Sequence, residues 1–298
     1  MDAARPLQRN TRRDRRLNTA LDAPAARAIT GAGGLTRLPT GLALPTGEYG
    51  LDRFGFESAA LERALPLLRF LDEIWFRTVW EQTEPLPRGR VLFVANRVGS
   101  EPWDALLLIA GALSTAAGPR LLRAPLSSGW LGLPWLGDLA RRLGGYPAHT
   151  ATAIELLREE EALLALPEDP RSLDARRPER IGRLNPAFVR LALATDSAIV
   201  PVAIAGGEDR APALVDLEAL GRRLGLPELA LTPLFPWLGP RGLLPLPARH
   251  HVIVGQPIHL RGFASDDDAT QSARAGIVQR ALQTLLDRAL ARRPGPWT

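Results

Sequence analysis

Short apolar runs alternate with helical patterns along most of the chain. Short, mostly apolar runs, typical of buried strands, occur at 90–96, 162–168, 197–206 and 251–258. Between or after them, apolar residues recur every three or four positions, which predicts helices at 103–113, 151–162, 187–195 and 274–293. This alternation predicts one α/β domain with a mostly buried, mixed or parallel sheet flanked by helices.

Three further apolar segments lack that alternation. Residues 61–80 carry apolar side chains at helical spacing and predict one more helix, which packs on the core or, alternatively, lies in a bilayer interface. The tryptophan-rich stretch 126–139 is expected to pack in the core or to frame an acyl tunnel. The stretch 231–247 holds too many prolines for a regular element and predicts an apolar loop, a candidate for bilayer contact.

The two ends of the chain differ in composition from its middle. Residues 1–48 are rich in Arg, Ala, Gly, Pro and Thr without sustained periodicity, and we expect a mostly disordered basic arm. A solvated tail is the first interpretation of its charge, attraction to anionic lipid the second, and nucleic-acid binding the third, since no recognition fold accompanies it. Residues 49–293 would then form the domain and 294–298 a tail.

Composition narrows the classes of function. The 298 residues can bury one full-sized core, and no cysteine is present, which excludes disulfides and thiolate metal sites. All 37 basic residues are arginines, a side chain that suits phosphate groups. No uncharged apolar stretch reaches eighteen residues and the N-terminus has no signal-like core, so we expect a cytoplasmic protein peripheral to the inner face of the membrane.

The predicted strand 90–96 leads into a short loop and the helix that follows. The loop runs Asn96-Arg97-Val98-Gly99-Ser100-Glu101-Pro102, and Asp104 lies just inside the helix. Backbone N–H groups at such a strand-to-helix junction suit an anion or a developing oxyanion. Asp104 is placed to reach back to a side chain of the loop, so this junction is the first candidate for a site.

At this junction the chain resembles the lysophospholipid and glycerol-phosphate acyltransferase family. One branch of that family has Asn-His-Ser-Gly-x-x-Pro-x-Asp after a strand, and Asn96, Gly99, Pro102 and Asp104 match it in register. Further blocks of the chain resemble the family in the same order, over most of residues 51–290: Asp52–Gly55, Trp75–Arg77, Leu166–Arg171, Ile199–Val202, Gly239–Pro247 and Gly255–Pro257.

The resemblance implies a reaction and a set of substrates. In the family a histidine removes the proton from an acceptor hydroxyl, which attacks the thioester of acyl-CoA or acyl carrier protein, and the aspartate orients that histidine. The acceptor is a lysophospholipid or glycerol phosphate, and neither a metal nor a bound cofactor is implied. Carried onto this chain, Asp104 is a catalytic candidate, and the substrate-binding candidates are Asn96, Gly99, Glu168, Arg171 and His149.

Three departures from the family pattern cluster at the chemistry. Arg97 stands where the family has its catalytic histidine, and a guanidinium has neither an acceptor lone pair nor a pKa near neutrality. Asp169 replaces the glycine of the Pro-Glu-Gly block, and Val98 replaces a serine. We expect Arg97 to form a salt bridge with Asp104; the alternative is that it grips a phosphate or carboxylate of a lipid.

The sequence therefore predicts an impaired acyltransferase that retains lipid or acyl-thioester binding. His149 is the histidine nearest the family's second block, yet an exposed loop histidine is its simpler interpretation. Two alternatives stay open: an active acyltransferase with a modified site, and a non-catalytic peripheral membrane scaffold. Expected partners are an acyl thioester, a lysophospholipid or phospholipid and a membrane surface, with no specific nucleic acid and no metal.

Overall fold

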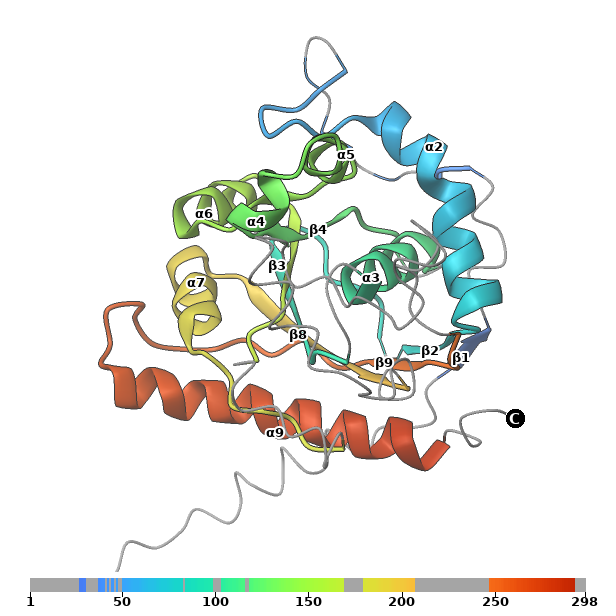
Figure 1. The fold of residues 1–298 in the computed structure, drawn as a ribbon. Helices are drawn as coiled ribbons and strands as arrows, with labels where there is room; N and C mark the ends of the chain where they lie inside the picture. The colour runs from blue at the N-terminus through green and yellow to red at the C-terminus, as the bar shows by residue number, and fades with distance from the viewer. Residues whose placement is uncertain are drawn as a thin grey trace, which may run out of the picture.

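The fold is taken from a computed structural model of the whole chain. It describes the positions 27–30, 37–40, 42, 44–45, 47, 50–82, 84–98, 103–115, 118–168, 179–206 and 247–292. Within these residues the chain forms a central sheet with helices on both faces (Figure 1).

Seven strands form the central sheet, in the order β1-β2-β9-β8-β3-β7-β4. Strands β4, β7, β3 and β8 are mutually parallel. Strand β9 is antiparallel to β8, and β2 is parallel to β9. Strand β1 forms the edge of the sheet and is antiparallel to β2. The bounds are β1 Arg27–Thr30, β2 Val79–Gln82, β3 Val91–Ala95, β4 Leu122–Arg123, β7 Ala162–Ala165, β8 Ala198–Ala205 and β9 His251–Val254. The predicted mixed, mostly buried sheet is confirmed.

Helices cover the sheet on its two faces. One core lies between the sheet and α2 (Ser58–Arg69), the π-helical turn η1 (Phe70–Trp75) and α3 (Trp103–Ser114). The other lies under α6 (Thr150–Arg158), α7 (Ala187–Thr195) and the long α9 (Asp268–Arg292), as Figure 1 shows. A smaller unit near β4 contains the paired strands β5 (Pro125–Leu126) and β6 (Tyr146–Pro147), with α4 (Ser128–Leu131) and α5 (Leu136–Arg142) between them.

The central strands have apolar residues on both faces because both faces are covered. All five residues of β3 and all eight of β8 are buried. The strands and helices predicted from the sequence between residues 90 and 293 match β3, β7, β8, β9, α3, α6, α7 and α9. Because β3 and β7 are parallel, the loops that follow their carboxyl ends lie at one edge of the sheet, where the predicted site lies.

The prediction of one helix over 61–80 was wrong for its last five residues. The helix α2 buries Leu61, Leu65 and Leu68 as expected, but it passes into η1 and ends at Trp75. Arg77 then adopts a positive φ of 43°, and Val79 begins the strand β2. Pairing of β2 with β9 and β1 decides the outcome, because tertiary strand pairing outweighs local periodicity.

Two other expectations need correction. The strand β1 lies inside residues 1–48, so the prediction of a disordered arm was wrong for these four residues; positions 1–26 and the apolar stretch 231–247 lie outside the described residues. In the tryptophan-rich stretch 126–139, Trp130 packs inside with 7% of its surface exposed, but Trp135 is 88% exposed. The expectation that this stretch packs in the core was therefore wrong for Trp135.

A buried ion pair holds the far edge of the sheet. Arg123 of β4 is fully buried, and its guanidinium donates to Asp52 at 2.6 Å and to Glu161 at 3.0 Å. Burial raises the pKa of Glu161, although the charge of Arg123 opposes that shift. Since Asp52 lies before α2, Glu161 before β7 and Arg123 in β4, this cluster joins three segments that are distant in the sequence.

A second buried cluster fixes the end of α9 to the sheet. Glu81 of β2 accepts a hydrogen bond from Arg292 and lies 2.7 Å from the Nε2 atom of His251. Burial alone would raise the pKa of Glu81, but the hydrogen bonds from Arg292 and His251 outweigh it and the pKa is lowered. The ionised carboxylate thus clamps β2, β9 and α9 together.

Candidate functional site

The site begins where β3 ends. Asn96, directly after β3, is 4% exposed. Its side-chain amide donates to the carbonyl of Ile204 at 2.9 Å, and its side-chain oxygen accepts from the N–H of Ile204 at 2.8 Å. These two bonds extend the contact between β3 and β8 by one more residue and fix the point at which the loop leaves the sheet. The structure thus shows a positioning role for Asn96, and its predicted substrate contact stays a prediction.

Glu168 joins the loop after β3 to the segment before α7. Its carboxylate is buried, with 3% of the residue exposed, and accepts the backbone N–H of Arg97 on one oxygen. The other oxygen accepts the N–H of Gly182 at 2.7 Å. Burial raises the pKa of Glu168; the two backbone hydrogen bonds and the positive charge of Arg97 act in the opposite direction without cancelling the shift.

Asp104 holds the same loop from the helix side. It lies in the first turn of α3, 1% exposed, and one of its carboxylate oxygens accepts the N–H of Val98 at 3.0 Å. Its negative charge also raises the pKa of Glu168, so the two acids and Arg97 act on one another electrostatically. The predicted salt bridge between Arg97 and Asp104 stays a prediction.

These contacts define what the cluster can do chemically. The buried carboxylates of Glu168 and Asp104 accept hydrogen bonds from two successive backbone N–H groups, those of Arg97 and Val98. The guanidinium of Arg97 adds a permanent positive charge to this cluster. A guanidinium can donate hydrogen bonds and balance negative charge, but it cannot accept a proton. The cluster therefore forms a strand-to-helix junction held by two carboxylates, and the side chain of Arg97 supplies no base there.

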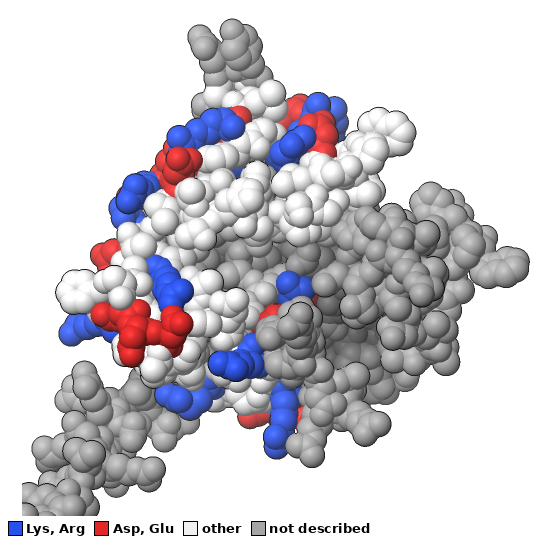
Figure 2. Space-filling model, turned by 60° about the vertical axis from the view of Figure 1, so that its left-hand side comes forward, with Lys and Arg blue, Asp and Glu red and all other residues white. Residues whose placement is uncertain are grey.

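A groove of about 670 Å³ opens beside Glu168. It lies between α6 and α7 at the carboxyl end of β7, and its lining combines apolar and polar side chains. Figure 2, in which the side with these helices comes forward, shows uncharged side chains over much of the described part of this face. The polar groups of the groove are His149, Thr150, Glu168, Arg183 and Asn185. Such a mixture suits an amphiphile, with an apolar body along the groove and a polar group at its rim.

The structure brings some of the predicted residues together. His149 is exposed directly before α6 and lines the same groove as Glu168, which is bound in turn to the backbone of Arg97. Gly99 and Arg171 lie outside the described residues, as does Asp169.

Sequence reasoning missed three polar residues of the groove, Thr150, Arg183 and Asn185. The side-chain oxygen of Asn185 accepts the N–H of Ala187, the first residue of α7, at 2.9 Å. The pair Asn185-Pro186 before an apolar helical pattern is a start signal that could have identified Asn185.

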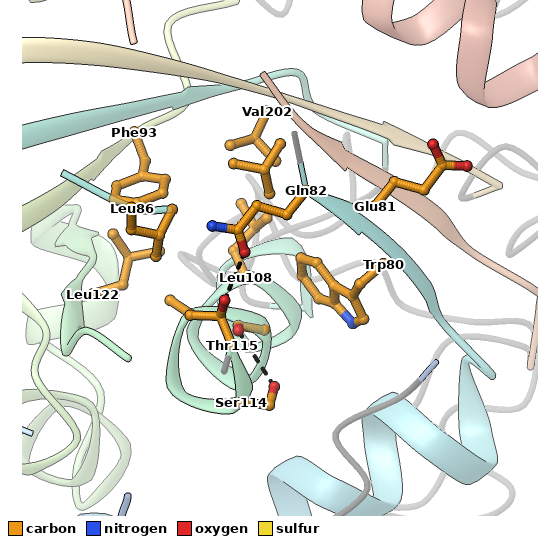
Figure 3. Close-up of a pocket in the computed structure, with 13 residues that line it drawn as sticks. Trp80, Glu81, Gln82, Leu86, Phe93, Leu108, Ser114, Thr115, Leu122 and Val202 are labelled. Atoms are coloured by element: carbon orange, nitrogen blue, oxygen red, sulfur yellow. Dashed lines mark hydrogen bonds between the residues drawn. The ribbon is translucent and has the colours of Figure 1, made fainter. Parts of the chain in front are cut away.

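A second cavity lies between α3 and the sheet, close to the end of α3. It holds about 30 Å³ and its walls are mostly apolar, as the close-up in Figure 3 shows. The ring of Trp80 packs against α3 at Gly111, where an added Cβ would lie 2.1 Å from the ring. The hydroxyl of Thr115 donates to the side-chain oxygen of Gln82 at 2.6 Å. This space is too small for a chain of several carbons, so the groove beside Glu168 is the better candidate for ligand binding.

Within the described residues, no group of three or more His, Asp or Glu side chains is arranged to hold a metal ion. Among the described helices, none is long and apolar enough to cross a membrane.

Comparison with known proteins supplies relatives of high similarity. The uncharacterized protein Rv0502 of Mycobacterium tuberculosis is 38% identical over 260 residues, which cover 83% of this chain and 72% of the relative. The uncharacterized protein ML2427 of Mycobacterium leprae is 36% identical over 260 residues, covering 83% of this chain and 70% of the relative. The chain belongs to the family of these mycobacterial proteins. Members of this mycobacterial family therefore share the domain that carries the groove.

The chain was also compared with protein-family models and with solved structures. No family model matches the chain. The crystal structure of the 1-acyl-sn-glycerophosphate (LPA) acyltransferase PlsC from Thermotoga maritima matches with a TM-score of 0.45 and 19% identity, covering 70% of this chain and 72% of that chain. A similarity of this degree does not bear on the activity of the mycobacterial family.

Proposed function

We propose that this protein is a relative of the glycerolipid acyltransferases that binds a lysophospholipid or an acyl thioester in the groove beside Glu168 and is impaired in acyl transfer. The observation that carries the proposal is the position of Arg97. It is the second residue after β3, its backbone N–H is held by Glu168, and its guanidinium cannot take a proton from an incoming hydroxyl. Loss of a positioned base lowers a rate by about 10²–10⁴.

The surrounding architecture supports retained binding. Asn96 and Asp104 keep the family's residue types and hold the junction through buried hydrogen bonds at 2.8–3.0 Å. The groove offers an apolar length with Arg183 and His149 on its rim. A lysophospholipid has a matching division between an acyl chain and a phosphate. No bound cofactor enters this proposal; the acyl thioester is a substrate.

The decisive experiment restores the missing base. Purified wild type and Arg97→His are incubated with labelled acyl-CoA or acyl carrier protein and several lysophospholipids. We expect transfer above background with Arg97→His and none with wild type, and Arg97→Gln serves as the control that removes the charge without supplying a base. Turnover by wild type at a rate that Arg97→His does not exceed would overturn the impaired-enzyme proposal.

A second candidate function is an active acyltransferase with a different proton acceptor. Glu168 favours it, because a carboxylate with a pKa raised by burial that lines a groove is a candidate acid or base. If wild type does transfer acyl groups, Glu168→Gln and His149→Gln separate the two acceptors on the groove. If both variants keep the wild-type rate, neither Glu168 nor His149 is the proton acceptor.

Binding is measured separately from transfer. Lysophospholipid affinity is followed by titration calorimetry with wild type and with Arg183→Ala, which removes an exposed cation from the rim of the groove. Arg180→Ala, an exposed arginine that does not line the groove, is the matched control. We expect weaker binding for Arg183→Ala alone, because its charge would face the lipid phosphate.

A further inference from the structure

An exposed apolar cluster lies on the short hairpin formed by α4 and α5. Trp135 is 88% exposed, and Leu136 and Leu139 are 48% and 49% exposed. The three side chains come from five consecutive positions, so they form one patch rather than scattered contacts with solvent. Leu139 and Arg142 lie three residues apart in α5, which places them on one side of the helix, and Trp135 directly precedes the first residue of α5.

The backbone holds this patch outward. Trp135 adopts φ 59° and ψ −40°, a conformation that L side chains rarely accept. The opposite side of α5 packs closely on α4 at Gly137, where an added Cβ would lie 2.7 Å from the carbonyl oxygen of Leu131. Trp130, five positions before Trp135, is buried and anchors α4. Trp130 thus packs into the protein, whereas Trp135 is exposed to solvent.

The charges beside the patch favour one kind of partner. The helix α5 carries Arg141 and Arg142, and both arginines form ion pairs with Asp138 at the surface. Arg142 also pairs with Glu57, directly before α2, at 3.2 Å. The side chains of Arg141, Arg142 and Asp138 are 41–52% exposed, so the pairs with Asp138 are weak and open to exchange. The chain as a whole has a net charge of +5. A tryptophan and leucines flanked by arginines match the apolar and phosphate layers of an anionic bilayer surface.

We propose that the α4–α5 hairpin docks on the surface of an anionic phospholipid bilayer. Trp135 and Leu139 enter the interfacial layer, and Arg142 exchanges its ion pairs with Asp138 and Glu57 for lipid phosphates. This inference goes beyond the proposed function, because docking needs neither a substrate nor a base.

The position of the hairpin relative to the groove gives the docking a consequence. The hairpin is bracketed by β5 and β6, which pair through Pro125 with Tyr146 and Leu126 with Pro147. Pro125 and Tyr146 also line the groove beside Glu168. A bilayer held by Trp135 would therefore lie against the wall of the groove, and an amphiphile could pass between the two without crossing bulk water.

The test uses the full chain and vesicles of phosphatidylcholine, alone or mixed with phosphatidylglycerol. Co-sedimentation is compared for wild type, for the double variant Trp135→Gly/Leu139→Ser, and for Phe263→Ser as a control that removes another exposed aromatic (73% exposed) elsewhere. Glycine accepts the positive φ of position 135, so the double variant should fold, and its thermal midpoint checks this. We expect binding to mixed vesicles to fall on the order of tenfold in the double variant and to be unchanged in the control.

Three results would overturn the proposal. The first is binding by wild type that the double variant retains. The second is no binding of wild type to the mixed vesicles at low salt. The third is sedimentation velocity showing a wild-type dimer that the double variant separates, since the patch would then be an interface between two copies.

Discussion

Replacing Glu168 by glutamine tests whether this acid is the joint of the site. In the wild type one oxygen accepts the N–H of Arg97 and the other accepts the N–H of Gly182 at 2.7 Å. The glutamine side chain has the same length but offers only one acceptor oxygen, and its amino group must face one of the two backbone N–H groups. The amino group of the glutamine then faces the N–H of Arg97 or of Gly182, so that two donors meet. Water cannot readily relieve this conflict, because position 168 is only 3% exposed.

The size of the effect follows from these contacts. One backbone N–H loses its partner in a buried place, which costs about 1–3 kcal/mol. Arg97 also loses a negative charge that lies near it, while the amide avoids the burial penalty of an ionised carboxylate. These last two changes oppose each other, so we expect Glu168→Gln to lower the free energy of unfolding by about 1–3 kcal/mol near neutral pH.

The pH dependence has a definite sign. Because the folded-state pKa of Glu168 is raised, its contribution to stability is fully present below the unfolded pKa and is lost as pH rises through the folded pKa. Wild type contains this contribution and Glu168→Gln does not. The stability deficit of the variant should therefore be largest in mild acid and smaller near neutrality.

Urea unfolding followed by circular dichroism measures this deficit across a pH series, with Glu62→Gln on the exposed side of α2 as the control. The reasoning fails if Glu168→Gln unfolds within about 0.5 kcal/mol of wild type at every pH, as a surface change would. A deficit that grows toward neutral pH would contradict the raised pKa while leaving the hydrogen bonds intact.

Two further predictions concern the packing around the sheet. Glu81→Gln should show the opposite pH dependence, because the pKa of Glu81 is lowered. The contribution of Glu81 to stability is present above the unfolded pKa and is lost as pH falls through the folded pKa. The stability deficit of Glu81→Gln in urea unfolding should therefore be largest near neutrality and shrink in acid. Gly111→Ala should lower the free energy of unfolding by about 1–3 kcal/mol, because the new methyl group meets the ring of Trp80, which is itself bonded to Asp72 at 2.9 Å. Restored stability in Gly111→Ala/Trp80→Leu would support that contact, whereas a stabilised Gly111→Ala would show that helix propensity outweighs it.

The sequence predicted the central strands because burial on both faces leaves an unmistakable pattern. The runs that became β3 and β8 contain no charge, and the helices between them keep their apolar spacing. The strand β2 was missed because its local pattern is misleading: Val79 continues the helical spacing of α2. Nothing in the local sequence shows that β2 pairs with β9, about 170 positions later in the chain. Two-residue strands such as β5 and β6 are too short for any periodicity.

The site was predicted in part. Asp104, Asn96 and Glu168 were identified through the family resemblance, but their actual bonds are to backbone groups of Val98, Ile204 and Gly182, which carry no side-chain signal. The outward Trp135 could not be distinguished from the inward Trp130, since both lie in one apolar stretch. A positive φ at a tryptophan is decided by the packing of α5 on α4, which only the folded structure reveals.

The contacts around Arg97 also decide whether a substitution at this position would disturb the site. Both acids that hold the loop bind backbone N–H groups, at Arg97 and Val98, and such bonds do not depend on which side chains those residues carry. Asn96 likewise binds the backbone of Ile204. Arg97→His would therefore leave every one of these contacts available, although it would remove the positive charge that opposes the effect of burial on the pKa of Glu168. Because the loop is held by its main chain, we expect Arg97→His to fold.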